Sequence, residues 1–344
     1  MNPPFRPFGP LHWTLSNLPK VKKWSLIGTV SPEDRCLSVL TQLEAKDALQ
    51  HAEFIRIDPN ARKGNPKFRE RFIKKLKKNE SLAKKTAKTN LEIHNSDILV
   101  NEGKLIQLLT DSVKACTNNL IIDISAMPKR FFIPLVTRAI EIGNVKNLVV
   151  TYTTPEKHGE SLAEDPQPWS SLPMFGAAPN REMNEVKLIV SVGYLPLRLR
   201  EKADGHQFNA SNVELLLPFP SVHPGFQKNW EFVSQIKQQI PNLKSSSIKR
   251  VATNNMPLAF EKIVAISNAG QTQCVLAPFG PKPISLAMCL YGVACRKNNL
   301  PIEIGYTQPQ VYADDYSSGI AMKNGQPHTK AYCIVLDGHS FYEF

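Results

Sequence analysis

The sequence predicts an α/β protein built from two tandem Rossmann-like halves with mainly parallel sheets, related by a pseudo-two-fold axis. Three observations lead to this prediction. The chain has 344 residues, which suits two domains because single hydrophobic cores stop growing at about 250–300 residues. Short segments rich in Val, Leu and Ile alternate with helical segments, the pattern of a parallel sheet covered on both faces. Finally, one run of elements occurs twice along the chain.

The repeated run consists of a helix, a strand, a Pro-Lys turn, an apolar helix and a second strand that ends in a Tyr-Thr pair. The first copy contains Pro128-Lys129 and Tyr152-Thr153. The second copy contains Pro281-Lys282 and Tyr306-Thr307 at nearly the same separation. This match predicts that the two lysines occupy equivalent strand-to-helix corners.

Two further matches set the expected boundary between the halves. An apolar strand follows each Tyr-Thr pair, one from Val186 and one from Lys330, and each is interpreted as the strand that ends its half. Near the start of each half, the strand from Trp24 is matched with the strand from Val213. The halves are therefore expected at residues 1–208 and 209–344.

The positive charge of the chain is concentrated in one segment. The net charge is +12, and residues 62–88 carry +10 of it, with twelve Lys or Arg and two Glu. Phe68, Phe72, Ile73 and Leu76 recur at helical spacing, which predicts an amphipathic helix with a cationic outer surface. We interpret the segment as an insert in the first half. It is either a solvated arm or a surface that docks on nucleic acid, an acidic protein or an anionic ligand.

Composition and motifs exclude several classes of protein. With 42% hydrophobic and 21% charged residues the chain is typical of globular proteins. Neither a membrane span nor a secretory signal is recognisable, and the six cysteines include no C-x-x-C pair, so we expect a cytoplasmic protein with reduced thiols. The motifs of P-loop, dinucleotide-binding, lipase-like and zinc-protease sites are missing. No histidine has a second His or Cys at ligand spacing, so neither a metal nor a cofactor is expected.

The Pro-Lys turns define the expected ligand site. Open α/β sheets bind ligands outside the carboxyl ends of their strands. Each turn leads into a helix N-terminus, where free N–H groups and the positive end of the dipole favour an anion. The alternative for either turn is a good helix start with a surface lysine. The expected ligand-binding residues are Ser125, Lys129, Arg130, Tyr152, Thr153, Gly280, Lys282, Tyr306 and Thr307.

Several of these side chains have a structural alternative. Asp123 ends the strand before Lys129 and is either a catalytic acid or a cap for the N–H groups of its own turn. Ser125 is expected to cap the following helix rather than to attack a substrate. The two tyrosines either stack on a base or are strand aromatics covered by helices. Weaker loop candidates, for a lid or for proton transfer, are Tyr312, Asp314, Asp315, His158, His223 and His339.

The segment from Ala277 to Ala294, APFGPKPISLAMCLYGVA, resembles part of a known family. Its strand, small-residue turn, Lys-Pro pair and apolar helix are similar to those of CRISPR-associated Rossmann-fold (CARF) sensor domains. Residues 123–140 resemble the same segment more loosely. The resemblance implies a cyclic oligonucleotide ligand and both halves of the usual dimer within one chain. Because no nuclease domain is apparent, it also implies a separate effector protein.

Together these observations lead us to expect a sensor that binds a nucleotide-type anionic ligand in a prokaryotic regulatory or anti-phage defence system. Two alternatives stay open. One is an enzyme that processes a nucleotide or nucleic acid with Asp123, Lys129 and groups from the opposite half. The other is an interaction subunit of a larger complex that uses the basic segment to hold its partner.

Overall fold

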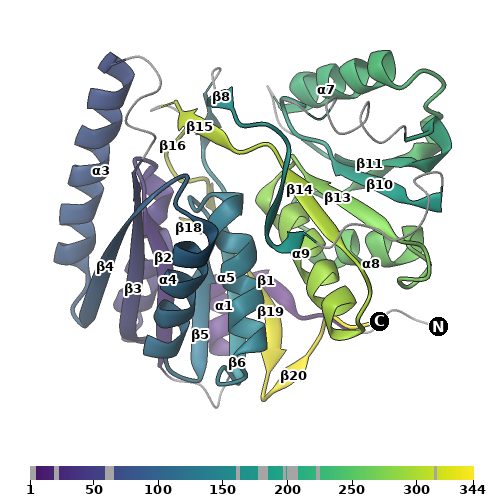
Figure 1. The fold of residues 1–344 in the computed structure, drawn as a ribbon. Helices are drawn as coiled ribbons and strands as arrows, with labels where there is room; N and C mark the ends of the chain where they lie inside the picture. The colour runs from purple at the N-terminus through teal and green to yellow at the C-terminus, as the bar shows by residue number, and fades with distance from the viewer. Residues whose placement is uncertain are drawn as a thin grey trace. The chain divides into compact units, whose positions relative to one another are not determined.

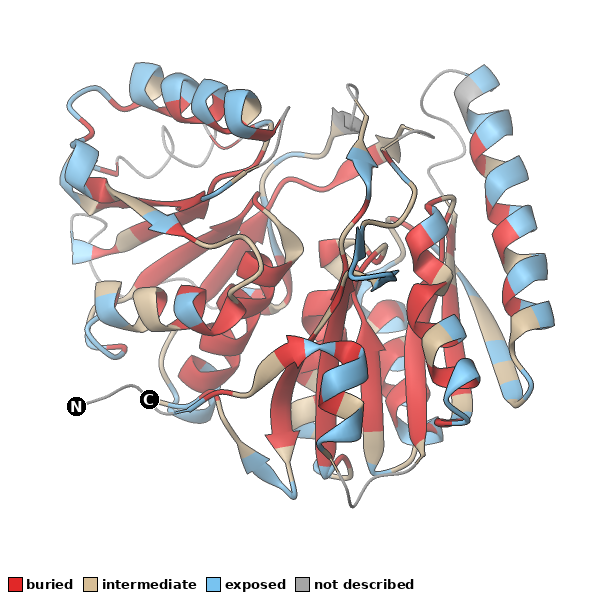
Figure 2. Ribbon diagram, turned by 180° about the vertical axis from the view of Figure 1, so that it is seen from behind, coloured by how far each residue is buried: buried red, intermediate tan, exposed pale blue. Residues whose placement is uncertain are grey.

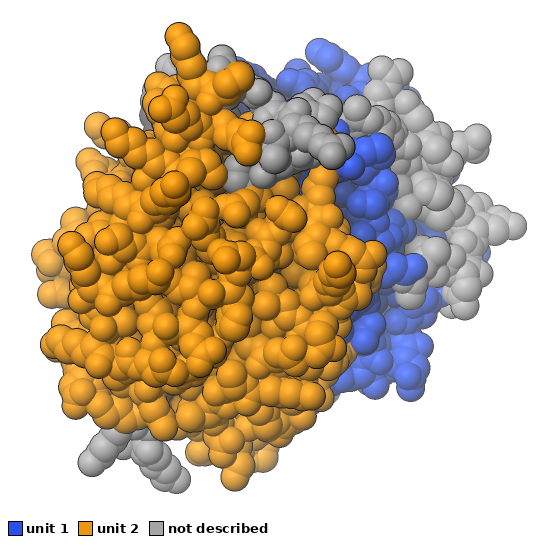
Figure 3. Space-filling model, turned by 60° about the vertical axis from the view of Figure 1, so that its left-hand side comes forward, with its two compact units in different colours: residues 1–4, 166–308, 342–344 blue, residues 5–165, 309–341 orange. Residues whose placement is uncertain are grey.

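The chain forms two compact units in a computed structural model (Figures 1 and 3). Unit 1 comprises Met1–Pro4, Pro166–Gln308 and Tyr342–Phe344, and unit 2 comprises Phe5–Asp165 and Pro309–Phe341. The described residues are 5–18, 23–58, 66–159, 163–176, 185–196, 199, 208–221, 225–313 and 316–344.

Unit 2 is built on a sheet with the strand order β1-β19-β6-β5-β2-β3-β4. Its parallel strands are β2 (Trp24–Val30), β3 (Leu49–Asp58), β4 (Asn90–Asp97), β5 (Asn119–Asp123) and β6 (Asn147–Thr153). One strand, β19 (Thr329–Leu336), pairs with β6 and runs antiparallel to it. Both β1 (Phe8–Pro10) and β20 (His339–Ser340) pair with β19 and run antiparallel to β19. The helices are α1 (Leu11–Ser16), α2 (Ser38–Ala45), α3 (Pro66–Thr86), α4 (Glu102–Ala115) and α5 (Lys129–Glu141).

Unit 1 is built on a sheet with the strand order β12-β11-β10-β13-β14-β9. Its parallel strands are β10 (Lys187–Ser191), β11 (Val213–Pro218), β12 (Ile248–Val251), β13 (Cys274–Pro278) and β14 (Glu303–Tyr306). A sixth strand, β9 (Ser170–Gly176), runs antiparallel to β14. The longer helices are α7 (Gly225–Gln239), α8 (Met256–Ile266) and α9 (Lys282–Lys297).

The two sheets have the same topology. Counted along the chain within each unit, the parallel strands lie in the order 3-2-1-4-5, and an antiparallel strand lies beside the fifth. This confirms the predicted α/β class with mainly parallel sheets. Lys129 begins α5 and Lys282 begins α9, and both helices connect the fourth strand of a sheet to the fifth. The prediction that the two lysines occupy equivalent corners is therefore confirmed.

The expected boundary at residue 208 is wrong, because strands are exchanged between the units. β10 does not end unit 2 but is the first and central strand of unit 1. The sixth strand of unit 1, β9, follows β6 in the chain, and the sixth strand of unit 2, β19, comes after β14. The match of Trp24 with Val213 fails for the same reason, since β2 is the first strand of its sheet and β11 is the second.

The basic segment is also not an insert. α3 connects β3 to β4 just as α7 connects β11 to β12, so it has a counterpart in the other unit. Phe72 and Leu76 are buried in the core with residues of β2, β3 and α2, and Asn79 donates to the Ser31 carbonyl at 2.7 Å. Figure 2 shows the resulting division of α3 into a buried and an exposed side.

The predicted amphipathic character of this helix is confirmed. Its outer surface carries the exposed cations Lys67, Arg69, Arg71, Lys74, Lys75, Lys77, Lys78, Lys84 and Lys85. Residues 62–65 and the side chain of Phe68 lie outside the described part of the chain. No described helix is both long enough and apolar enough to cross a membrane.

Candidate functional site

Each sheet reverses its strand order at one point. The reversal lies between β2 and β5 in unit 2 and between β10 and β13 in unit 1. Loops that leave the carboxyl ends of two such strands diverge, and this is where open α/β sheets bind ligands. The two Pro-Lys corners follow β5 and β13, so both predicted corners lie at the reversal point of their sheet.

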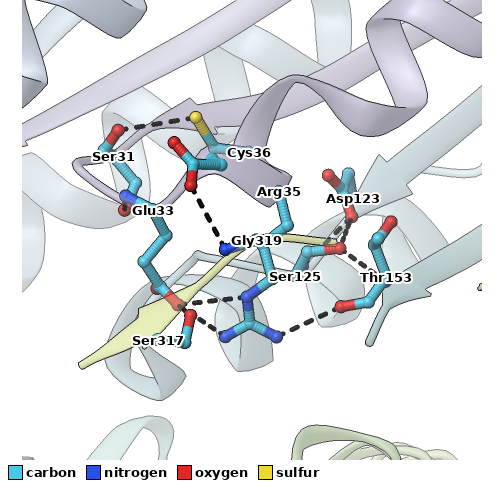
Figure 4. A network of polar contacts seen from close by, with 10 residues as sticks. Ser31, Glu33, Arg35, Cys36, Asp123, Ser125, Thr153, Ser317 and Gly319 are labelled. Carbon is cyan, nitrogen blue, oxygen red and sulfur yellow. Dashed lines mark hydrogen bonds and ion pairs between the residues drawn. The ribbon is translucent and has the colours of Figure 1, made fainter. Parts of the chain in front are cut away.

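In unit 2 the polar side chains of the loop after β5 form hydrogen bonds with one another and with β6 (Figure 4). Asp123 Oδ1 accepts hydrogen bonds from Ser125 N at 3.1 Å, from Thr151 Oγ1 at 3.3 Å and from the Ser125 hydroxyl. The Ser125 oxygen in turn accepts from Thr153 N at 2.8 Å, which ties the loop to β6. Asp123 thus has the contacts expected of a turn-stabilising carboxylate. Ser125 does not cap α5, whose N-cap residue is Pro128, so that expectation is wrong.

A buried ion pair lies beside this loop. Arg35 Nη2 and Nε donate to Glu33 Oε2 at 2.7 and 3.0 Å, and Nη1 donates to the Thr153 carbonyl at 3.1 Å. The side chains are 2% exposed for Arg35 and 10% for Glu33. Burial by itself lowers the pKa of Arg35, but the Glu33 carboxylate together with Tyr152 and Tyr316 outweighs burial, and the net pKa is raised. The Arg35 guanidinium therefore stays charged at neutral pH.

Sequence reasoning missed Glu33 and Arg35. Both lie in the segment Ser-Pro-Glu-Asp-Arg, which directly follows the fully buried strand β2. Charged residues at the carboxyl end of a buried central strand were the available signal, because such a position is the expected edge of a ligand site.

A second segment is attached to the same ion pair. The Ser317 hydroxyl donates to Glu33 Oε2, and Gly319 N donates to Asp34 Oδ2 at 3.2 Å. Ser317 belongs to β16 (Ser317–Ser318), which pairs with β7 (Lys157–His158). The loop after β2 thereby fixes the segment that leads towards β19.

Of the weaker loop candidates, the structure describes Tyr312, His158 and His339. Tyr316, which burial keeps protonated by raising its pKa, packs edge-on against both His158 and Tyr312. His339 is exposed in β20. Asp314, Asp315 and His223 lie outside the described residues.

The remaining predicted residues of unit 2 contact other parts of the fold. Lys129 is 9% exposed at the start of α5. Arg130 Nη2 donates to the Val100 carbonyl at 2.7 Å, and burial lowers the pKa of Arg130. The Tyr152 ring lies 5.5 Å from the Arg35 guanidinium, and Thr153 Oγ1 is 2.9 Å from Thr329 Oγ1. Tyr152 and Thr153 are thus covered by protein groups.

The equivalent corner of unit 1 is mainly apolar. Leu276 and Pro278 stand where unit 2 has Asp123 and Ser125. After them Phe279 packs against three aromatic rings, with centroid separations of 5.4 to 6.2 Å. These rings belong to Trp169, Phe232 and Tyr306. The predicted binding residue Tyr306 is therefore part of an aromatic cluster and is 8% exposed.

Gly280 lies against the end of β10. A Cβ atom at Gly280 would be 2.0 Å from Ser191 Oγ and 2.6 Å from the Val192 carbonyl oxygen. A Cβ at Gly193, in the loop after β10, would be 2.3 Å from the Phe279 carbonyl oxygen. The two loops at the reversal point of unit 1 thus approach so closely that both positions require glycine.

Two buried hydroxyl groups at this corner have no hydrogen-bond partner within the described part of the chain. They are Oγ of Ser191, at the end of β10, and Oγ1 of Thr307, directly after β14. Both residues are 0% exposed. Thr307 matches Thr153, whose hydroxyl is paired in unit 2. Lys282 is half-buried and is the first residue of α9, the helix that follows the neighbouring strand β13. The two corners are therefore equivalent in topology and different in chemistry.

Comparison with known proteins assigns no family. No family model matches the sequence, and no curated protein matches it. A universal stress protein from Archaeoglobus fulgidus DSM 4304 aligns over 83% of this chain and 96% of its own, with 8% identity and a TM-score of 0.24. A Yersinia pestis DHPS solved with a pterine-sulfa conjugate aligns over 80% and 94%, with 12% identity and a TM-score of 0.17. At such TM-scores neither similarity carries information about function.

Proposed function

We propose that the protein binds a nucleotide-type anionic ligand at the corner of unit 1 where α9 begins. The observation that carries this proposal is the pair of unpaired buried hydroxyls, Ser191 and Thr307, within the described residues. Ser191 ends β10 and Thr307 directly follows β14, and these two strands are the neighbours of β13 in the sheet. A buried hydroxyl without a partner costs about 1–3 kcal/mol. Polar groups of a bound ligand would remove this cost.

The start of α9 supports an anionic ligand. Pro281 is its N-cap residue and makes no side-chain hydrogen bond to the helix, and its first turn contains no acidic residue. No carboxylate of that turn therefore occupies the positive end of the helix dipole, and this end favours a phosphate group. Lys282 adds a full positive charge at the same place.

Unit 1 is favoured over unit 2 because, within the described residues, the threonine hydroxyl of the Tyr-Thr pair has no partner in unit 1 and has one in unit 2. In unit 2 the hydroxyl of Thr153 is paired with Thr329, and Ser125 bonds to Asp123 and to Thr153 N. The hydrogen bonds of unit 2 also favour a binding protein over an enzyme. Asp123, the candidate catalytic acid, already accepts three hydrogen bonds at Oδ1.

The ligand class and the setting rest on the resemblance of residues 277–294 to CARF sensor domains. A cyclic oligonucleotide is the ligand that this resemblance favours, in a regulatory or anti-phage defence system with a separate effector protein. A reducing, cytoplasmic location is part of the proposal and is supported by six free cysteines, all of them buried.

The test is calorimetric titration of the full chain with mononucleotides, linear dinucleotides and cyclic oligoadenylates. We expect one of these classes to bind and Lys282→Ala and Thr307→Val each to weaken binding at least tenfold. Lys297→Ala is the matched control, since Lys297 is exposed at the opposite end of α9.

Two results would contradict the proposal. One is the absence of binding by every nucleotide class to the folded wild-type chain. The other is binding that Lys282→Ala and Thr307→Val leave unchanged. Thr307→Val should not destabilise the free protein, because an apolar group of similar shape replaces an unpaired hydroxyl.

A further inference from the structure

Two histidines and two glutamates lie together on one face of unit 2, away from the Pro-Lys corner of that unit. His51 and Glu53 are two residues apart on β3, and Glu92 and His94 are two residues apart on β4. Residues at this spacing point to the same face of a strand. In the parallel register Glu53 lies opposite Glu92, and His94 is two positions further along.

The contacts centre on Glu53, which is only 1% exposed. Its Oε1 lies 2.6 Å from His51 Nε2 and its Oε2 lies 2.5 Å from His94 Nε2. A carboxylate buried in a strand is costly unless it is fully compensated. Two imidazole N–H groups provide this compensation, but they leave the role of exposed Glu92 unexplained.

The donor set fits a divalent cation. Ligand atoms of His51, Glu53 and Glu92 all lie within 4.8 Å of one another. Zinc accepts both imidazole nitrogen and carboxylate oxygen as ligands, whereas hard cations such as Mg²⁺ prefer oxygen ligands alone. Two carboxylates and a neutral imidazole also balance the charge of a divalent ion.

We propose that His51, Glu53 and Glu92 bind Zn²⁺ at this edge of the unit 2 sheet. His94 is a positioning residue, because it holds the second oxygen of Glu53 and so orients the first. Exposed Glu92 leaves room for water as a further ligand. The bound ion would fasten β4, the outer strand of the sheet, to β3.

Asn90 supports this assignment. Its side-chain amide lies 3.5 Å from His51 Nδ1 and 3.3 Å from Glu92 Oε1. Its Nδ2 donates to Glu92 Oε1 and so orients this exposed carboxylate. Outer partners of this kind hold the ligands of a metal site in place.

The experiment measures Zn²⁺ and Co²⁺ binding to the full chain after removal of metal with a chelator. We expect one Zn²⁺ per chain, a higher unfolding temperature with Zn²⁺, and visible d–d absorption with Co²⁺. His51→Gln and Glu92→Gln should each weaken Zn²⁺ binding at least tenfold. His94→Gln should weaken it by about 10- to 100-fold and change the Co²⁺ spectrum, as expected for a positioning residue.

His12→Gln is the control, because His12 is exposed on α1. The proposal is overturned if the wild type binds no Zn²⁺, or if Glu92→Gln binds it as tightly as the wild type does. Glu92 is exposed and its replacement does not threaten folding, so the test holds even where a histidine variant misfolds. Nucleotide binding plays no part in these measurements, and the outcome is independent of the function proposed above.

Discussion

Removing the cation of the buried Glu33–Arg35 pair is expected to destabilise unit 2 strongly. Arg35→Met keeps an unbranched apolar stem of similar length but deletes the three hydrogen bonds that the guanidinium donates. Glu33, with a side chain 10% exposed, would be left as a buried charge without its partner. Breaking such a pair costs about 3–5 kcal/mol. We expect the lower end of this range, because Ser317 still donates to Glu33.

A second variant separates the loss of charge balance from the loss of packing. In Glu33→Gln/Arg35→Met no buried charge is left alone, so most of the lost stability should return. Lys84→Met is the matched control, because Lys84 and Glu80 form an ion pair of the same 2.7 Å length with Lys84 60% exposed. That exposed pair should contribute less than about 1 kcal/mol.

The assay is urea unfolding of the full chain, followed by circular dichroism and tryptophan fluorescence. Trp24 is a suitable probe, since it is 1% exposed in β2 of the same unit. An Arg35→Met variant that loses less than about 1 kcal/mol would refute the reasoning. So would a double variant that is no more stable than Arg35→Met alone.

Three other results are expected. Leu76→Ala should lower the free energy of unfolding by about 2–5 kcal/mol, because Leu76 is 0% exposed in α3. A change below about 1 kcal/mol in thermal unfolding would mean that α3 is not part of the core. Gly280→Ala should lower the free energy of unfolding by about 1–3 kcal/mol, because its Cβ would clash with Ser191. Adding Ser191→Gly should restore part of this stability. A Gly280→Ala variant as stable as the wild type would contradict the close approach of the two loops. Burial raises the pKa of Cys36 to about 12 from an ordinary 9.0, so the unfolded thiol ionises first and stability should fall as the pH rises above 9. In urea titrations the stability of Cys36→Ala should decrease less with pH than that of the wild type. An unchanged dependence of stability on pH would contradict a raised pKa of the Cys36 thiol.

The equivalence of the two Pro-Lys corners could be predicted because each copy is local in sequence. Turn chemistry and helix starts depend on neighbouring residues, and they repeat when the sequence repeats. The sheet that a strand joins depends on distant residues instead. The strand from Val186 and the strand from Lys330 are both apolar runs after a Tyr-Thr pair, yet one is central and parallel and the other is antiparallel. Their patterns gave no sign of the exchange.

The interpretation of the basic segment as an insert rests on its charge, which differs from that of the rest of the chain. Charge describes the outer surface of α3, and the buried side is set by Phe72, Leu76 and Ala83. That apolar spacing was visible in the sequence and is typical of a helix that covers a sheet. Its spacing was a better guide to the role of the segment than its net charge.

The polar clusters could be predicted only in part. Asp123 and Ser125 were found because they lie beside a motif, whereas Glu33 and Arg35 precede a helix with no repeated pattern around them. The ligands of the proposed zinc site come from two strands, and their meeting depends on the register between β3 and β4. The spacings His-x-Glu and Glu-x-His place each pair on one face of its strand, but sequence alone does not give the register between the strands.

Native mass spectrometry of the intact protein, equilibrated with each nucleotide class, tests the proposed ligand site most directly. The wild type and Lys297→Ala should carry the added mass of one nucleotide-type ligand, and the Lys282→Ala/Thr307→Val variant should have the mass of the bare chain. A ligand retained equally by all three proteins would contradict the assignment of the site. Bare chains in every sample would contradict nucleotide binding itself.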